Sequence, residues 1–394
     1  MVQVAAAFAE RSHDSLRDVA VCPQSAAHGV CVRVAIVTES FLPQINGVTN
    51  SVLRVCEQLA DRGGQTLVVA PGPGPDTYAG ARVVHAPSLP LPGYHDFRVA
   101  RPWPGLGTVL REFAPDVVHL ASPAVLGAQA AFTAKALGLP VVAVYQTDLA
   151  GFARRYGLRA AERMTWRWLR TIHDAASRTL APSRHAVSEL RRNGVQRVDH
   201  WARGVDLHRF DPMHRDVELH DRLAPAGKVL VGYVGRLAHE KEVGLLAGLR
   251  GLPGLRLVVV GDGPQRAALQ RQLPGVSFLG FQERAQLATT FASLDVLVHT
   301  GSAETFCQVA QEGLASGVPV VAPAAGGLLD LVRDGENGRL FIPGSAASLR
   351  ATVDTLVRDP ALRATLTEQA RPSVAGRTWN AIGDQLVRHY EEVA

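Results

Sequence analysis

The chain has 394 residues, of which 47% are hydrophobic and 20% are charged, and its net charge is +5. This length exceeds what a single hydrophobic core usually supports, so two domains are expected. The sequence has no run of about 18 apolar residues, which argues against a membrane-spanning helix. It also shows no nucleic-acid-binding module, so no nucleic-acid partner is predicted. The positive charge is compatible with anionic ligands or an anionic membrane surface.

The cysteines and the N-terminal segment indicate a cytoplasmic protein. Cys22, Cys31, Cys56 and Cys307 have no Cys-x-x-Cys spacing, so they are predicted to be free thiols in a reducing compartment. Residues 1–31 contain acidic residues and lack a sustained apolar core, which argues against a signal peptide. This N-terminal extension is either a disordered segment or the result of an upstream start, and the sequence leaves both open.

Strand-like apolar runs alternate with helical segments after residue 31, which predicts an α/β fold of two Rossmann-like, doubly wound domains. The first domain is placed at 32–203, with strands near 32–37, 66–70, 116–120, 140–145, 178–181 and 198–201. The second domain is placed at 204–375, with strands near 228–234, 255–260, 276–279, 295–298, 319–322 and 339–341. Apolar positions at helical spacing predict a last helix over 378–393.

The turn after the first strand, Gln44-Ile45-Asn46-Gly47, carries a glycine just before a helix predicted near 48–61. A glycine at such a turn lets the backbone approach a phosphate. No Gly-x-Gly-x-x-Gly follows the strand, so a dinucleotide site is excluded. Gly47 is therefore a candidate ligand-binding residue, and the alternative of a purely structural turn glycine stays open.

A second turn of the first domain, Tyr145-Gln146-Thr147-Asp148, follows another predicted strand. Gln146 cannot titrate, so it is not a general acid or base, but its amide can donate a hydrogen bond to a developing negative charge or to a sugar. Asp148 is the one obvious candidate for a nucleophilic carboxylate in this half. Its alternative role is to cap a helix that begins near Leu149.

The segment 151–172 combines arginines with aromatic residues. A helix there places four arginines on one face, which suggests contact with an anionic lipid surface. These arginines are Arg159, Arg163, Arg167 and Arg170. The alternative is a solvated face over a buried stripe of Met164, Trp166 and Trp168.

In the second domain, the strand near 228–234 is followed by a turn with two cations, Gly235-Arg236-Leu237-Ala238-His239-Glu240-Lys241. Ligands bind beyond the carboxyl ends of strands in open α/β sheets, so Arg236 and Lys241 are candidates for binding an anion. Taken alone, this segment also fits two solvated charges at the start of a helix.

Residues 301–317 place two carboxylates eight positions apart, where a loop becomes an apolar helix. Glu304 can accept hydrogen bonds from sugar hydroxyls, and Glu312, about two turns along the helix, can reach a second polyol such as a ribose. Between them, the backbone donors around Phe306 and Cys307 and the helix dipole favour a phosphate. The segment predicts a site for a nucleotide-sugar.

In this order the motifs resemble glycosyltransferase family 4, the retaining nucleotide-sugar enzymes of GT-B architecture. The resemblance covers roughly residues 32–390 and includes Gly261-Asp262-Gly263-Pro264 and Gly326-Gly327. It implies two domains facing a central cleft, with the acceptor bound by the first, the nucleotide-sugar bound by the second, and residues 376–394 packing back on the first. The donor-binding set that it implies is Gly47, Gly235, Arg236, Lys241, Gly263, Glu304, Phe306, Cys307 and Glu312.

The chain departs from the family at Gln146, where many members have a histidine that contacts the donor. No Asp-x-Asp occurs in the sequence, so neither a metal nor another cofactor is expected, and cations with the helix start near 307 would neutralise the leaving diphosphate. The family favours a same-face reaction, and the hypothesis is that the donor phosphate acts as the base. The candidate catalytic residues are Arg236, Lys241, Glu304, Gln146 and Asp148.

Residues 37–52 and 145–153 look like those of bacterial GDP-mannose-dependent alpha-mannosyltransferases that act on glycolipids. The expected partners are GDP-mannose as donor, a lipid-linked or small-molecule acceptor, and the inner face of the membrane as a peripheral contact. Two alternatives stay open. One is a UDP-sugar-dependent enzyme acting on a soluble metabolite or natural product, and the other is a non-catalytic nucleotide-sugar-binding protein or membrane scaffold.

Overall fold

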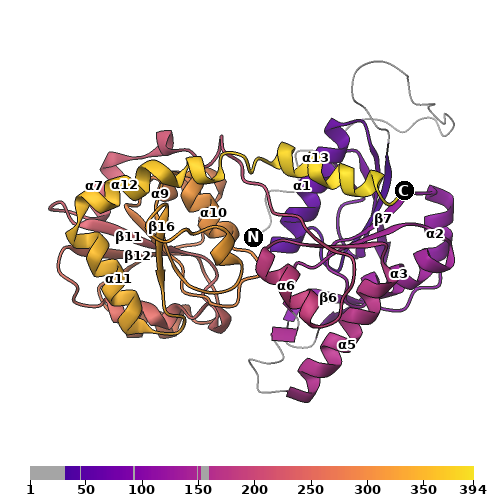
Figure 1. Ribbon diagram of the computed structural model, residues 1–394, viewed down its shortest axis with the longest axis horizontal. Coiled ribbons are helices and arrows are strands. Elements are labelled where there is room, and N and C mark those ends of the chain that lie inside the picture. Colours follow the sequence, from indigo (N-terminus) through magenta and orange to yellow (C-terminus); the bar gives the residue numbers. More distant parts are fainter. Residues whose placement is uncertain (1–31, 45, 92–93, 149, 152–158) are drawn as a thin grey trace.

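The computed structural model describes residues 32–44, 46–91, 94–148, 150–151 and 159–394, so the N-terminal extension and Leu149 lie outside the described residues. Two large sheets lie side by side, each covered by helices (Figure 1). Each sheet is built mainly from parallel strands, and the central strands such as β1 and β11 are almost continuous apolar runs, as expected for strands buried on both faces. The two doubly wound domains predicted from the sequence are therefore confirmed.

The first sheet has eight strands in the order β10-β9-β8-β7-β1-β2-β4-β3, and all neighbours are parallel except β3 and β4. Its strands are β1 Arg33–Val37, β2 Gln65–Pro71, β3 Thr77–Tyr78, β4 Ala81–Ala86, β7 Val117–Leu120, β8 Val141–Val144, β9 Arg178–Ala181 and β10 Val198–His200. The helices of this half are α1 Gly47–Asp61, α2 Leu106–Phe113, α3 Leu126–Ala136, α5 Arg159–Ala175 and α6 Arg184–Arg192.

The sequence-based prediction missed the strands between residues 77 and 100. Besides β3 and β4, this segment forms an antiparallel pair, β5 Ser88–Leu91 and β6 Tyr94–Ala100. Pro87 and Pro90 interrupt the apolar pattern there, and proline within a run argues against a central strand. β3 is the edge strand of the sheet, β4 lies next to it, and β5 and β6 pair outside the sheet, where a continuous apolar run is not needed.

The second sheet has six strands in the order β13-β12-β11-β14-β15-β16, and the paired strands are all parallel. Its strands are β11 Val229–Val234, β12 Leu255–Val260, β13 Ser277–Gly280, β14 Val296–Val298, β15 Val320–Pro323 and β16 Gly338–Phe341. Its α-helices are α7 Val217–Leu223, α8 Arg266–Gln272, α9 Arg284–Ser293, α10 Gln308–Ala315, α11 Ala346–Arg358 and α12 Pro360–Ala370. The 3-10 turns are η1 Pro212–His214, η2 His239–Lys241, η3 Val243–Leu249, η4 Gly326–Asp330 and η5 Pro372–Val374.

The last helix, α13 Trp379–Glu391, leaves the second half and lies along α1 of the first half (Figure 1). Ile382, Leu386 and Tyr390 are buried in the same core cluster as strand β1. The Tyr390 hydroxyl lies 2.7 Å from Nδ1 of His119 on β7, and burial lowers the pKa of His119 to about 3, so the ring is neutral. The predicted return of the C-terminal helix is confirmed.

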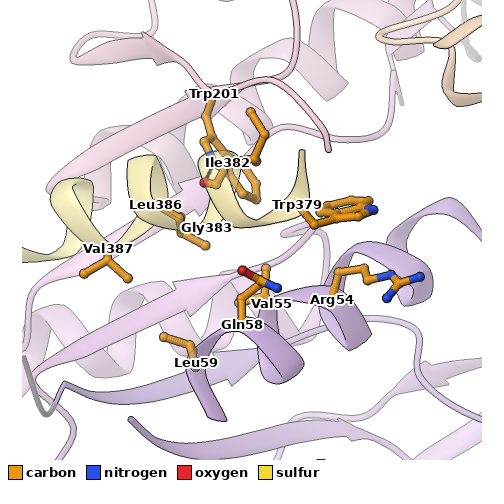
Figure 2. A pocket seen from close by; sticks show the side chains of 10 residues that line it. All are labelled: Arg54, Val55, Gln58, Leu59, Trp201, Trp379, Ile382, Gly383, Leu386 and Val387. Carbon is orange, nitrogen blue, oxygen red and sulfur yellow. Dashed lines mark hydrogen bonds between the residues drawn. The ribbon is translucent and has the colours of Figure 1, made fainter. Parts of the chain in front are cut away.

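A small crevice between α1 and α13 shows how closely the two helices pack (Figure 2). At its mouth the Arg54 guanidinium lies 5.9 Å from the centre of the Trp379 ring. A Cβ atom on Gly204 would lie 2.5 Å from that ring, so the junction needs glycine there. The chain crossing between the halves is thus fixed by side-chain packing.

Candidate active site

Glu304 lies in the loop between β14 and α10 and is held by two cationic or polar side chains. Its Oε1 atom is 2.5 Å from Nζ of Lys241 and 3.0 Å from Nε2 of His299. Burial alone would raise the pKa of Glu304, but the hydrogen bond from His299 and the charge of Lys241 lower it to about 2. Glu304 is therefore an ionised acceptor, 15% exposed. It can receive hydrogen bonds from the hydroxyls of a sugar.

The backbone of Glu304 is fixed by the two glycines that follow β15. The Gly327 amide donates to the Glu304 carbonyl oxygen at 2.7 Å. Gly326 has a φ of +59°, and a Cβ atom there would lie 2.5 Å from the same oxygen. The Gly326-Gly327 pair is thus needed for close approach to the Glu304 loop, which positions the carboxylate.

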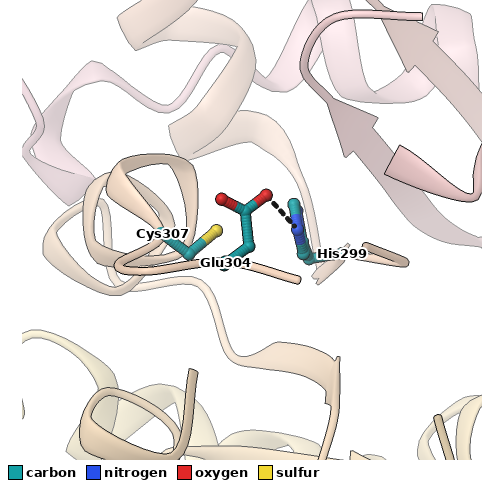
Figure 3. A group of neighbouring side chains, drawn as sticks. All are labelled: His299, Glu304 and Cys307. Atoms are coloured by element: carbon teal, nitrogen blue, oxygen red, sulfur yellow. Dashed lines mark hydrogen bonds and ion pairs between the residues drawn. The ribbon is translucent and has the colours of Figure 1, made fainter. Parts of the chain in front are cut away.

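His299 is a site residue that the sequence analysis did not single out. It follows β14 directly, is buried, and stacks on the ring of Tyr233 at 6.5 Å between centres and 15° between planes. Figure 3 shows its ring directed at Glu304, with the Cys307 side chain close by. Burial alone would lower the pKa of His299, but Cys307 and Glu304 raise it. A histidine five positions before the glutamate, directly after a buried strand, was the available signal.

Arg236 and Lys241, predicted to act together, differ in their surroundings. Lys241 pairs with Glu304, whereas the Arg236 side chain is 59% exposed and lies 3.8 Å from Glu240. Both leave the carboxyl end of β11 through Gly235, whose φ is +151°. Arg236 is therefore placed to meet an anion from solvent, while Lys241 would have to share its charge between Glu304 and that anion.

Gly263 closes the neighbouring turn, after β12. Its φ is +156°, and a Cβ atom would lie 2.5 Å from the carbonyl oxygen of Leu237. A Cβ on Gly261 would lie 2.0 Å from the carbonyl oxygen of Gly235. The two glycine turns therefore stack backbone on backbone, which brings the ends of β11 and β12 together beside the Glu304 loop.

Phe306, Cys307 and Glu312 lie at the start and along the length of α10. Phe306 and Cys307 are buried in the core of the second half, so their backbone rather than their side chains would face a phosphate. Cys307 is the N-cap of α10 and gives it no side-chain hydrogen bond. Burial raises the pKa of Glu312 to about 7, opposed by a hydrogen bond from Gln308 and by the charge of Arg209.

Across from these residues, Arg203 joins two predicted positions of the first half. Its guanidinium donates to the Gly47 carbonyl oxygen at 3.2 Å and to Oε1 of Gln146. The other end of the Gln146 amide donates to the Ala121 carbonyl oxygen at 2.7 Å. The sequence analysis missed Arg203, which is the last residue of the predicted first domain. Burial lowers the pKa of Arg203 to about 10, so it stays cationic at neutral pH.

Hydrogen bonds connect the two sides of the site. The Thr305 hydroxyl donates to the Gln146 carbonyl oxygen at 3.1 Å. Gln311 and Gln308 of α10 donate to the carbonyl oxygens of Arg203 and Gly204 at 3.0 and 3.1 Å. The loop that carries Glu304 is thereby tied to the turn that carries Gln146.

Asp148 bonds within its own turn. Its Oδ1 atom accepts from the Gly151 amide at 2.6 Å and from the Tyr145 hydroxyl at 3.4 Å. Gly47 opens α1, whose N-cap is Asn46, and a Cβ atom there would only contact Arg203 at 3.5 Å. These contacts fit the two structural alternatives, a capping aspartate and a turn glycine at a helix start.

Comparison with known proteins shows which family has this fold. A family model described as Glycosyltransferase Family 4 matches residues 45–209, and one described as Glycosyl transferases group 1 matches residues 215–373. HepE of Anabaena, solved in complex with UDP, has a similar structure, with a TM-score of 0.76 and 21% identity over 91% of this chain and all of that one. The fold is thus that of the GT-B glycosyltransferases.

Two curated relatives are much more similar in sequence. A GDP-mannose-dependent alpha-mannosyltransferase of Mycobacterium tuberculosis is 48% identical, covering 92% of this chain and 97% of its own. One of the same name from Corynebacterium glutamicum is 46% identical, covering 92% of this chain and 89% of its own. With both family models matched in order, this chain belongs to glycosyltransferase family 4 and is a glycosyltransferase.

Proposed function

We propose that this chain transfers mannose from GDP-mannose to a hydroxyl of a lipid-linked acceptor, with retention of the sugar's configuration and without a metal. The observation that carries the proposal is the 46 to 48% identity, over nine-tenths of the chain, to enzymes named for that donor. The ionised Glu304, held by Lys241 and His299, supports it as a built acceptor for sugar hydroxyls.

Each donor group has a matching side chain. Glu304 accepts hydrogen bonds from the mannose hydroxyls, and Glu312 accepts them from the ribose. Arg236, Lys241 and the amides that open α10 meet the diphosphate, where they stabilise the charge that develops as GDP leaves. The arrangement needs no metal to offset that charge because two cations and a helix start supply it.

In the proposed reaction the bond between the anomeric carbon and the phosphate oxygen breaks. A bond from the acceptor hydroxyl oxygen forms on the same face, and the hydroxyl proton passes to the departing phosphate oxygen of GDP. Asp148 would be the nucleophile of a covalent route, but one of its oxygens is bonded to the Gly151 amide at 2.6 Å. That contact supports the same-face route.

The lipid-linked acceptor is supported by the outer face of α5. Met164 and Trp168 are 72% and 45% exposed, although Trp166 of the same helix is buried. The Trp168 ring packs against the exposed Phe132 of α3 at 6.4 Å between centres. Exposed arginines stand beside this apolar surface at positions 163, 167 and 170. Apolar side chains next to cations suit a surface that lies on anionic lipid.

Two of the three residues of the predicted stripe, Met164 and Trp168, are thus exposed, and only Trp166 is buried. This favours contact of α5 with a membrane over the alternative in which the apolar side chains are buried and only the arginines face solvent. Within the part of the chain that is described, no helix combines the length and apolar character needed to cross a membrane. Contact through α5 would therefore be peripheral.

The donor is tested by calorimetry and thermal shift with GDP, UDP, GDP-mannose and UDP-glucose. We expect stabilisation by GDP and GDP-mannose. Lys241→Ala should weaken the binding of both, and Glu304→Ala should weaken the binding of GDP-mannose. A preference for uridine nucleotides would replace the proposal by a UDP-sugar enzyme with a soluble acceptor. The rate of GDP release from GDP-mannose should likewise fall in Glu304→Ala and in Lys241→Ala.

The acceptor surface is tested by flotation with vesicles that contain anionic lipid, at low salt. The wild type is expected to float, and the double variant Arg163→Glu, Arg167→Glu is expected to stay at the bottom of the gradient. Arg271→Glu, an exposed arginine of α8, is the matched control and should float. A wild type that fails to float removes the membrane contact but leaves the donor assignment intact.

A further inference from the structure

Three side chains of different chemistry converge beside the donor site. One ligand atom each from His299, Glu304 and Cys307 lies within 4.8 Å of the others (Figure 3). His299 and Cys307 are buried, and Nε2 of His299 lies 3.0 Å from Oε1 of Glu304. The cluster is distinct from the expected anion contacts because it offers a thiol, an imidazole and a carboxylate together.

This set of ligands suits a thiophilic divalent cation. Zinc binds Cys, His and Glu in tetrahedral geometry, with neighbouring ligand atoms about 3.3 to 3.8 Å apart for the usual bond lengths. In the structure the three ligand atoms lie within 4.8 Å of one another, so they have to move closer together to bind one ion. All three residues come from one nine-residue loop, 299–307, and stacking on Tyr233 fixes the imidazole. Three protein ligands leave the fourth position open to water.

Lys241 is the competitor for this ion. Its ammonium occupies the Glu304 carboxylate at 2.5 Å, and its side chain is 28% exposed, so it has a path to solvent. A bound Zn²⁺ balances the charges of the Cys307 thiolate and the Glu304 carboxylate, and the thiol proton passes to solvent. The Lys241 ammonium would then lose its ion pair with Glu304 and turn towards solvent.

We infer that His299, Glu304 and Cys307 form an inhibitory site for Zn²⁺ or a similar thiophilic cation, which competes with the nucleotide-sugar for Glu304. The ion takes no part in the reaction. It withdraws the carboxylate that accepts the sugar hydroxyls and displaces the lysine that faces the diphosphate.

The test uses Co²⁺ as a spectroscopic probe on the full chain with Cys22 and Cys31 replaced by serine, which removes thiols outside the described residues. We expect one equivalent of Co²⁺ to give a near-ultraviolet thiolate-to-cobalt band, and Zn²⁺ to abolish it. In Cys307→Ser the band should vanish and zinc affinity should fall more than about 100-fold, since even second-shell changes cost 10- to 100-fold. Cys56→Ala, the other described free cysteine, is the control and should keep the band.

A missing band at one equivalent, or a band that survives in Cys307→Ser, overturns the inference. His299→Gln should weaken the band without removing the thiolate, and Lys241→Met should tighten zinc binding because the competing ammonium is gone. Competition with the donor is measured by titrating zinc into the protein with and without GDP-mannose. A saturating concentration of GDP-mannose is expected to weaken zinc binding at least tenfold. If metal-free protein does not bind GDP-mannose, the proposed function fails while the metal site stands on the cobalt spectrum.

Discussion

The two sides of the candidate site are built in different ways. On one side the Glu304 group, which consists of Lys241, His299, Glu304 and Cys307, draws three members from a single nine-residue loop. On the other side the Arg203 group, which consists of Gly47, Gln146 and Arg203, joins residues separated by 57 and 156 positions. Three members of the first group can be found close together in the sequence, whereas Lys241 and the whole of the second group are brought into place only when the sheets are assembled.

The largest expected effect lies in the Glu304 group. Glu304→Gln keeps the shape of the side chain but removes the charge that binds Lys241 and accepts the sugar hydroxyls. We expect kcat to fall by about 10²- to 10³-fold, as for the loss of one preorganised contact to the reacting groups. Initial rates of GDP release measure this. Glu368→Gln, an exposed glutamate of α12, is the control, and equal activity in both variants would contradict the role of Glu304.

Glu312 sharpens the comparison through pH. Burial raises its pKa from the usual 4.5 to about 7, so the folded protein binds more protons than the unfolded chain between these values. The stability contributed by this group therefore falls as pH rises from about 4.5 to 7, by up to about 3 kcal/mol and less where water reaches the carboxyl. Urea unfolding of the wild type and of Glu312→Gln across this pH range measures the effect. The free energy of unfolding of the wild type, relative to that of the variant, should fall as pH rises, and a constant or rising value would contradict the prediction.

The Arg203 group is tested by a double-mutant cycle. Arg203→Lys keeps the charge but loses the planar fork that reaches Gly47 and Gln146 together, so the turn that carries Gln146 should shift. We expect kcat/KM to fall by about 10- to 50-fold, because small misplacements at a site have effects of this size. With Gln146→Ala in the cycle, the two effects should not add. Arg192→Lys, exposed on α6, is the control.

The smallest effect concerns the helix that joins the two halves. Tyr390→Phe removes the hydroxyl that meets His119 at 2.7 Å and leaves a buried imidazole nitrogen without that partner. The free energy of unfolding should fall by about 1 to 2 kcal/mol. Tyr78→Phe, whose hydroxyl meets the half-exposed Glu57, should lose less. Equal losses in the two variants would show that the buried contact of α13 with β7 stabilises the fold no more than the half-exposed contact of Tyr78.

Much of the fold was predictable because buried parallel strands appear as continuous apolar runs. The runs at β9 and β12 match their predicted limits, 178–181 and 255–260, and the last helix was found from its apolar spacing. The segment 77–100 was not, because β3 has two residues, Arg82 and His85 interrupt the apolar run of β4, and β5 and β6 pair outside the two large sheets. The domain limits at 203 and 375, the absence of a metal requirement and the roles of the site residues stay predictions.

The sequence by itself determined most of the elements and the positions of Glu304 and Glu312, because each rests on residues that are close together in the chain. The order of several such motifs along the chain indicated the family. The tertiary structure decided which charges meet. Lys241 reaches Glu304 across 63 positions, and Arg203 reaches Gln146 rather than an acidic side chain. Such pairs depend on which strands are neighbours in a sheet, and strand order follows from the packing of the whole chain.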